Sequence, residues 1–188
     1  MTRQLLFVQG AGEGTHDDWD ETLVASLALS LGPGYTIRYQ RMPFEDDPSF
    51  ARWGEALRTE LDALDAGAVL VGHSIGATIL IHVLAEEPPV RPHAGLFLIA
   101  MPHIGDGGWP SEEIAAKPDL GSRLPPQTAI HLYQGDADDI VPLAHAHLNK
   151  SAIPQARLRI LPGRDHQLND DLSDVAADIL ALDRRDAR

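Results

Sequence analysis

The sequence predicts an α/β fold in which a mostly parallel sheet, of roughly six strands, is covered by helices on both faces. Short apolar runs typical of buried strands alternate with longer segments whose apolar residues recur at helical spacing. In such folds, ligand chemistry gathers at the carboxyl ends of the strands. The 188 residues show no composition break and no linker rich in Pro, Gly or Ser, so we expect a single domain over residues 1–188.

The first part of the chain predicts two strands, each followed by a helix. Residues 5–8 are an apolar run typical of a buried strand, and the glycine-rich residues 9–14 predict a loop. Residues 19–31 place an apolar side chain at every fourth position, which indicates a helix that ends at Gly32. The same signals continue with an alternating strand at 35–39, a loop at 42–48 and a helix at 50–64.

The second part continues the alternation. The apolar run 69–72 predicts a strand, and the apolar spacing of 75–86 predicts a helix that the two prolines after it stop. Prolines and glycines break residues 101–126, where we expect at most one short helix, near 112–116. The remaining predicted elements are strands at 94–100, 128–133 and 157–161 and helices at 142–150 and 168–182.

Composition limits the class of protein. Without cysteine the chain has no disulfide, no zinc–thiolate site and no cysteine nucleophile, which is compatible with a reducing compartment. The 28 acidic and 15 basic residues give a net charge of −13, which repels nucleic acid and anionic membranes. The apolar run 5–8 is too short for a signal peptide, and no apolar stretch is long enough to span a membrane. We therefore expect a soluble, cytoplasmic protein that binds neither nucleic acid nor membranes.

One motif stands between a predicted strand and a predicted helix: Gly72-His73-Ser74-Ile75-Gly76. A serine at the tip of such a turn has a strained backbone that exposes its hydroxyl, and the glycines leave room where a side chain would collide. The free N–H groups at the start of the helix point toward any anion that forms beside the serine. Gly-x-Ser-x-Gly occurs by chance in roughly one chain in twenty of this length, but few chance matches have this strand and helix. We therefore interpret the motif as a nucleophile elbow.

A serine nucleophile needs a base, and the base needs an acid that orients it. Both residue types follow Ser74 in the chain, each just after a predicted strand. Asp136, Asp138 and Asp139 lie in one such loop, and His166 lies in the last one. All three aspartates are candidates for the acid from their position alone.

The chain resembles the α/β-hydrolases over nearly its whole length. The acid loop of that family often reads Gly-x-x-Asp-x-x-Val-Pro, which implies Asp138 as the acid, and its last loop reads Gly-x-x-His, which implies His166 as the base. The chain is most similar to the small lidless serine hydrolases of the retinoblastoma-binding-protein-nine type. The resemblance also implies an oxyanion hole formed by the backbone N–H groups of Ala11 and Ile75. One departure is Gln9, where many members have histidine.

Three other patterns in the sequence fail as metal or cofactor sites. His145 and His147 lie two apart in a predicted helix and point in different directions, which makes a poor metal pair. Asp136 begins a weak calcium-loop pattern that fails because its sixth position is Val141 instead of glycine. A dinucleotide fingerprint after the first strand fails at Thr15. We therefore expect no cofactor and no metal. His73 could line a pocket or simply pack in the core.

These observations predict a serine hydrolase that cleaves short, soluble carboxylic esters or similar acyl compounds. Ser74 would attack a small acyl substrate, His166 would carry the proton, Asp138 would orient His166, and water would release the acyl-enzyme. One alternative is C–C bond, thioester or cofactor-free perhydrolysis chemistry on the same residues. Another is a module on this fold that binds a protein partner. Residues 42–50 and 101–126 are expected to supply the pocket walls, the latter without a lipase-type lid.

Overall fold

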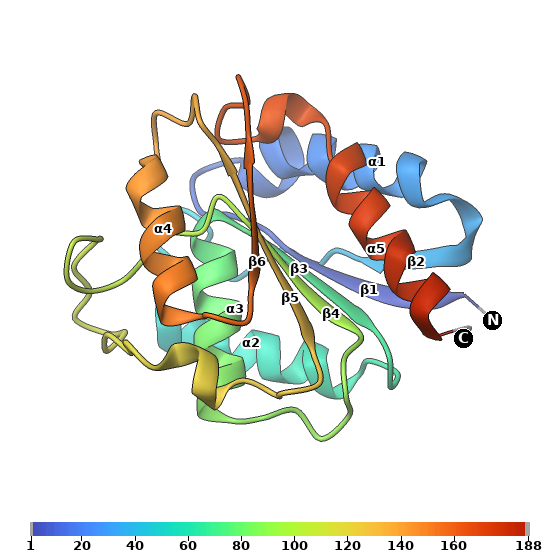
Figure 1. Cartoon of the computed structure of the whole chain (residues 1–188), viewed down its shortest axis with the longest axis horizontal. Coiled ribbons are helices and arrows are strands. Elements are labelled where there is room, and N and C mark those ends of the chain that lie inside the picture. Colours follow the sequence, from blue (N-terminus) through green and yellow to red (C-terminus); the bar gives the residue numbers. More distant parts are fainter. Residues whose placement is uncertain (1, 187–188) are drawn as a thin grey trace.

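A single sheet of parallel strands runs through the centre of the molecule (Figure 1). The computed structural model describes residues 2–186, and within them the sheet has six strands in the order β2-β1-β3-β4-β5-β6. Every pairing is parallel, as the alternation of strands and helices predicts. The strands are β1 (Arg3–Val8), β2 (Tyr35–Arg38), β3 (Val69–His73), β4 (Gly95–Ile99), β5 (Ala129–Gly135) and β6 (Arg157–Leu161).

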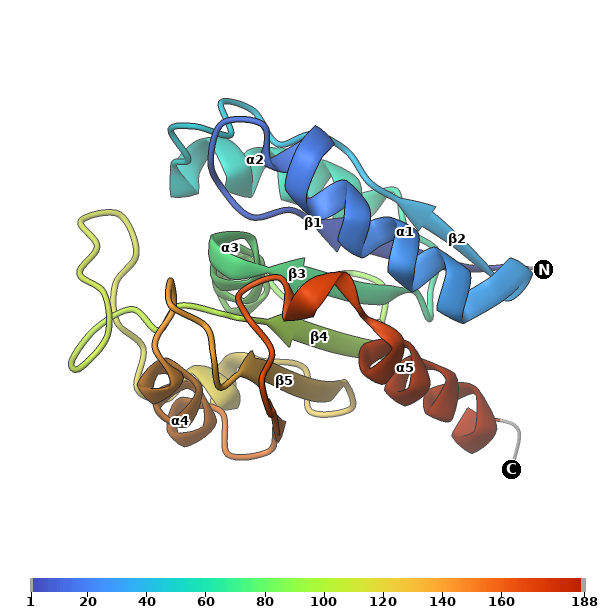
Figure 2. The same cartoon turned by 90° about the horizontal axis from the view of Figure 1, so that it is seen from above.

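Helices cover both faces of this sheet (Figures 1 and 2). Helices α1 and α5 pack on one face, and α2, α3 and α4 pack on the other. Each face has its own core, because successive side chains of a strand point to opposite sides. Leu70 packs toward α2 and α3, whereas its neighbours Val69 and Val71 pack toward α1 and α5. The helices are α1 (Asp20–Leu31), α2 (Phe50–Asp62), α3 (Ser74–Glu86), α4 (Leu143–Ala152) and α5 (Ser173–Asp186).

Strand β3 lies in the interior of the sheet, and all five of its residues are buried. A strand covered on both faces needs a continuous apolar run, which explains why Val69, Leu70 and Val71 show no alternation. Its register pairs Leu70 with Leu6 of β1 and with Leu96 of β4. The strand thereby holds the residues that follow it at the centre of one sheet edge.

Two predicted elements need correction. The helix expected near 112–116 does not form; these residues make an irregular turn held by Ser111 Oγ, and a 3₁₀-helix follows at Leu120–Arg123. Pro118 disfavours helical backbone in the residue before it, which leaves too few residues for a helix. The closing helix begins at Ser173 instead of 168, because Leu168, Asn169 and Asp170 have φ between 53° and 55°.

The other elements agree with the predictions to within about two residues at their ends. A π-helical turn at Thr15–Trp19 precedes α1 and was not expected from the sequence. None of the described helices has both the length and the apolar character that crossing a membrane requires.

Candidate active site

Ser74 lies directly after β3, at the start of α3, with φ at +52°. Glycine is required on both sides of it by close backbone packing. A Cβ at Gly72 would lie 2.7 Å from Cα of Ala77, and a Cβ at Gly76 would overlap the carbonyl oxygen of Gln9. The sharp turn that the motif predicts is therefore present, and it presents the Ser74 hydroxyl to the cavity described below.

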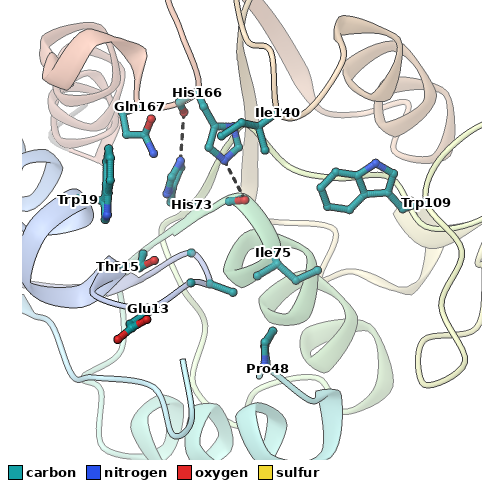
Figure 3. A pocket seen from close by; sticks show the side chains of 14 residues that line it. Glu13, Thr15, Trp19, Pro48, His73, Ile75, Trp109, Ile140, His166 and Gln167 are labelled. Atoms are coloured by element: carbon teal, nitrogen blue, oxygen red, sulfur yellow. Dashed lines mark hydrogen bonds between the residues drawn. The ribbon is translucent and has the colours of Figure 1, made fainter. Parts of the chain in front are cut away.

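His166 stands beside this serine, in the loop after β6. Its Nε2 lies 3.0 Å from Ser74 Oγ (Figure 3). Its Nδ1 lies 2.8 Å from Oδ2 of Asp138. Because the carboxylate can only accept, Nδ1 carries the proton and donates a hydrogen bond to Asp138. Nε2 is then unprotonated and accepts the hydrogen bond from the serine hydroxyl. This tautomer is the one that a general base for Ser74 needs.

The carboxylate of Asp138 is fully buried and accepts several hydrogen bonds. Gln134 Nε2 donates to Oδ2 at 2.7 Å, and the backbone N–H groups of Ile140 and Val141 donate to Oδ1 at 2.9 and 2.8 Å. Burial alone would raise the pKa of Asp138, but the hydrogen bond from His166 and those from the backbone N–H groups of Val141 and Ile140 outweigh it and lower the pKa. The carboxylate therefore stays ionised in neutral solution.

The two neighbouring aspartates have different surroundings. Asp136 accepts a hydrogen bond of 2.6 Å from the backbone N–H of Gly163 and so connects the loop after β5 to the loop after β6. Asp139 is exposed. Of the three candidates, Asp138 is the one that the structure brings into hydrogen-bond contact with His166.

The loop after β1 carries Ala11 to the same place. Ala11 and Ile75 both line the cavity beside Ser74. The backbone N–H of Gly10 donates to Asp20 Oδ2 at 2.7 Å, and that of Gly12 donates to the carbonyl of Glu45 at 2.7 Å. These bonds hold the loop on both sides of Ala11. The N–H of Ala11 takes part in neither of them.

Gln9 stands where many α/β-hydrolases have histidine, and it is fully buried. Its Nε2 donates to Glu45 Oε2 at 2.6 Å, and its Oε1 accepts from the backbone N–H of Met42 at 2.9 Å. Gln9 therefore joins the loop after β1 to the loop that precedes α2.

A cavity of about 440 Å³ opens over Ser74, within the usual size range of small-molecule sites. Trp19 and Trp109 stand on opposite sides of it, and Ile140 lies near His166 (Figure 3). The segments 42–50 and 101–126, expected to supply the walls, contribute one lining residue each. The lining residues are Gly10, Ala11, Gly12, Glu13, Thr15, Trp19, Pro48, His73, Ser74, Ile75, Trp109, Ile140, His166 and Gln167.

Several of these wall residues are missed by sequence reasoning. The apolar spacing of residues 19–31 predicts that Trp19 begins a helix, but Trp19 ends the π-helical turn before α1 and is 56% exposed. Ile140 is 52% exposed although it is apolar. The available signal was position, since both residues belong to segments that follow strands of the same sheet edge.

The other histidines that the sequence analysis considers are His73, His145 and His147. His73 is buried and also lines the cavity, so it both packs in the core and lines the pocket, the two roles that the sequence left open. Nδ1 of His145 accepts a hydrogen bond from the backbone N–H of His103 at 2.9 Å. His147 is exposed on α4.

Comparison with known proteins gives a family and a fold. The family model for serine hydrolases matches residues 5–166. A comparison with curated protein sequences gives no match.

Solved structures match nearly the whole chain at low identity. The esterase domain of a Rhodothermus marinus protein is 21% identical with a TM-score of 0.67, over 97% of this chain and 87% of that one. The esterase RhEst1 from Rhodococcus sp. is 16% identical with a TM-score of 0.71, over 96% and 90%. An α/β serine hydrolase without a lid from Xanthomonas campestris is 18% identical with a TM-score of 0.61, over 98% and 83%. The chain therefore belongs to the serine hydrolase family, and its fold is that of the α/β-hydrolases.

Proposed function

We propose that this enzyme hydrolyses short, water-soluble carboxylic esters through an acyl-enzyme on Ser74. The observation that carries the proposal is the hydrogen-bonded chain from Ser74 Oγ to His166, at 3.0 Å, and on to Asp138, at 2.8 Å. A serine hydroxyl becomes an effective nucleophile only when a neighbouring base removes its proton, and this chain supplies that base in the correct tautomer.

The proposed reaction follows from these positions. Ser74 Oγ attacks the ester carbonyl while His166 Nε2 takes the hydroxyl proton, and the tetrahedral oxyanion forms beside the N–H groups of Ala11 and Ile75. Collapse of this intermediate breaks the bond to the alcohol oxygen, which receives the proton from His166. Water then attacks the acyl carbon with His166 again as base. The bond to Ser74 Oγ breaks, the serine recovers its proton from His166, and the carboxylic acid leaves. Ionised Asp138 stabilises the His166 imidazolium in both halves.

The class of substrate is supported by the walls of the cavity. Ile75, Trp19, Trp109 and Ile140 offer apolar surface to an acyl chain or a small alcohol group. Residues 101–126 contribute Trp109 alone and place no regular helix over the opening. The net charge of −13 disfavours anionic substrates and interfaces. The Rhodothermus marinus and Rhodococcus proteins are described as esterases, which agrees with an ester as the substrate.

A fluorophosphonate probe tests the chemistry, because it forms a covalent bond with an activated serine. We expect labelling at Ser74 and turnover of nitrophenyl butyrate, and we expect Ser74→Ala to lose both, with a fall in kcat of about 10⁶-fold. Ser151→Ala is the matched control, since Ser151 lies exposed on α4 and donates only to the carbonyl of His147. Labelling of folded Ser74→Ala, or near-normal turnover by it, contradicts the proposal.

The size of the substrate is tested separately. Rates on nitrophenyl butyrate and nitrophenyl palmitate are compared below and above the concentration at which the palmitate ester aggregates. We expect the butyrate ester to be preferred and no rise in rate on aggregation. Activation by the aggregated ester would show instead that the enzyme works at a lipid interface.

A further inference from the structure

A second Asp–His pair lies buried behind Ser74. The Nδ1 atom of His73 lies 2.9 Å from Oδ1 and 3.0 Å from Oδ2 of Asp20. The side chain of His73 is 2% exposed and that of Asp20 is 0% exposed. His73 is the last residue of β3 and Asp20 is the first residue of α1, so the contact joins elements 53 positions apart in the sequence. The proposed reaction steps use neither residue.

The partners of His73 indicate how many protons its ring carries. Its Nε2 lies 3.1 Å from the backbone carbonyl oxygen of His166, which can only accept a hydrogen bond. Its Nδ1 faces the carboxylate of Asp20. A neutral imidazole has one N–H and can serve only one of these acceptors, whereas an imidazolium serves both. An imidazolium beside a carboxylate also leaves the buried pair with no net charge, which lowers the cost of burial.

The same pair touches the oxyanion loop, by which we mean residues 9–12. Asp20 Oδ2 accepts the backbone N–H of Gly10 at 2.7 Å, one residue before Ala11. Gly10 also packs against the pair itself: a Cβ at this position would lie 3.2 Å from His73 Nδ1 and 3.2 Å from Ser74 Cβ. The two residues therefore contact both sides of the site: Asp20 bonds the oxyanion loop, and His73 bonds the backbone of the proposed base (Figure 3).

We propose that Asp20 and His73 form a buried carboxylate–imidazolium pair that positions the oxyanion loop against the backbone of His166. The proposal rests on the proposed function, because it assigns the pair a role in the reaction of Ser74. Both are positioning residues, since they act on the site through Gly10 and through the carbonyl of His166.

The electrostatic surroundings of His73 agree with this state. Burial alone would lower the pKa of His73, but the charge and the hydrogen bond of Asp20 outweigh burial and raise it, and the His166 carbonyl and the charge of Asp138 act in the same direction. The other titratable ring that faces His73 is that of His166, with ring centres 4.8 Å apart.

The protonation state can be measured without any substrate. In ¹⁵N-labelled protein, the ring nitrogens of an imidazolium give two similar chemical shifts, whereas those of a neutral ring are widely separated. We expect the signal of His73, assigned by its loss in His73→Gln, to be that of an imidazolium at pH 8. We expect Asp20→Asn to convert it to a neutral ring. A neutral His73 in the unaltered protein at pH 8 would overturn the ion pair.

The positioning role is measured by kinetics. Asp20→Asn keeps an oxygen that can accept from Gly10 and removes only the charge, so the ring of His73 loses one of its two donors. We expect kcat on nitrophenyl butyrate to fall about 10- to 100-fold, the effect of small displacements at a reacting centre. KM should change less than about threefold. The rate of fluorophosphonate labelling should fall as kcat does.

The matched control is His82→Gln, which changes a buried histidine of α3 outside the site. Its kcat should stay within about twofold, and all variants are compared by circular dichroism to confirm folding. If Asp20→Asn is folded and labels at the unaltered rate, the positioning role is wrong while the proposed function stands. If the unaltered protein is not labelled, the proposed function is wrong, and the ¹⁵N measurement still decides the ion pair.

Discussion

Gly76 offers the sharpest test of the proposed oxyanion hole, because a side-chain change cannot delete a backbone donor but can displace one. In α3, Gly76 packs directly on the backbone of the oxyanion loop. A Cβ at this position would overlap the carbonyl oxygen of Gln9 and would lie 3.0 Å from its carbonyl carbon and 3.1 Å from Cγ1 of Val8. Ordinary contacts between such atoms are about 3.5–4.0 Å, so Gly76→Ala forces the helix and the loop apart by at least about 1 Å.

This displacement falls between the two proposed donors. Ile75 precedes Gly76 in the helix, and Ala11 follows Gln9 by two residues in the loop. A shift of about 1 Å at a reacting centre costs on the order of 10²-fold in rate, and complete loss of one oxyanion donor costs about 10²–10³-fold. We therefore expect Gly76→Ala to lower kcat by at least about 100-fold. Overpacking should also lower the free energy of unfolding by about 1–3 kcal/mol.

The assay is turnover of nitrophenyl butyrate, with urea unfolding measured on the same samples. Gly34→Ala is the control, since a Cβ at exposed Gly34 meets no atom within 4 Å. We expect its kcat to match that of the unaltered protein. A folded Gly76→Ala enzyme with kcat within threefold of the unaltered value would refute the reasoning, because the contact would then relax without moving either amide.

The remaining predictions concern the acid and the pH dependence of stability. Asp138→Asn should lower kcat on nitrophenyl butyrate by about 10⁴-fold, because an amide favours the wrong tautomer of His166, whereas Asp139→Asn should change it less than threefold; equal effects would argue against Asp138 as the acid. Burial first, and then the positive charge of Lys117, lower the pKa of His82 from 6.5 to about 4. The unfolded chain therefore binds a proton that the folded chain does not, and stability is lost as the pH falls from 6.5 toward 4, by at most about 3 kcal/mol. Urea unfolding at pH 7 and pH 4.5 should show a smaller loss for His82→Gln than for the unaltered protein, and an equal loss would contradict this account.

The sheet was predictable because its signals are local. Residues 69–72 carry an unbroken apolar run, and the turn after them needs glycine at two fixed positions. Once the strands are placed, parallel pairing brings the loops after β3, β5 and β6 to one edge, which is why Ser74, Asp138 and His166 could be selected before their distances were known.

The rest depends on contacts between distant segments. The pairing of His73 with Asp20 spans 53 positions and has no sequence pattern. Trp19 follows an apolar spacing that fits a buried helix face, yet the π-helical turn directs it to the cavity. Leu168 carries a side chain that disfavours the left-handed backbone, whereas Asn169 and Asp170 tolerate it, so the surrounding fold is needed to select it over three successive residues.

The hydrogen bonds of Glu45 show which residues around the cavity can be changed without disturbing the oxyanion loop. Its carboxylate accepts from Gln9 and from the backbone N–H of His16, and its backbone carbonyl accepts from Gly12. A substitution that removes the carboxylate would therefore loosen the oxyanion loop. Trp109 and Ile140 enter the cavity from other loops and take no part in these bonds. A library of variants at these two positions would therefore change which acyl or alcohol groups fit. The hydrogen bonds around Ser74 would stay as they are.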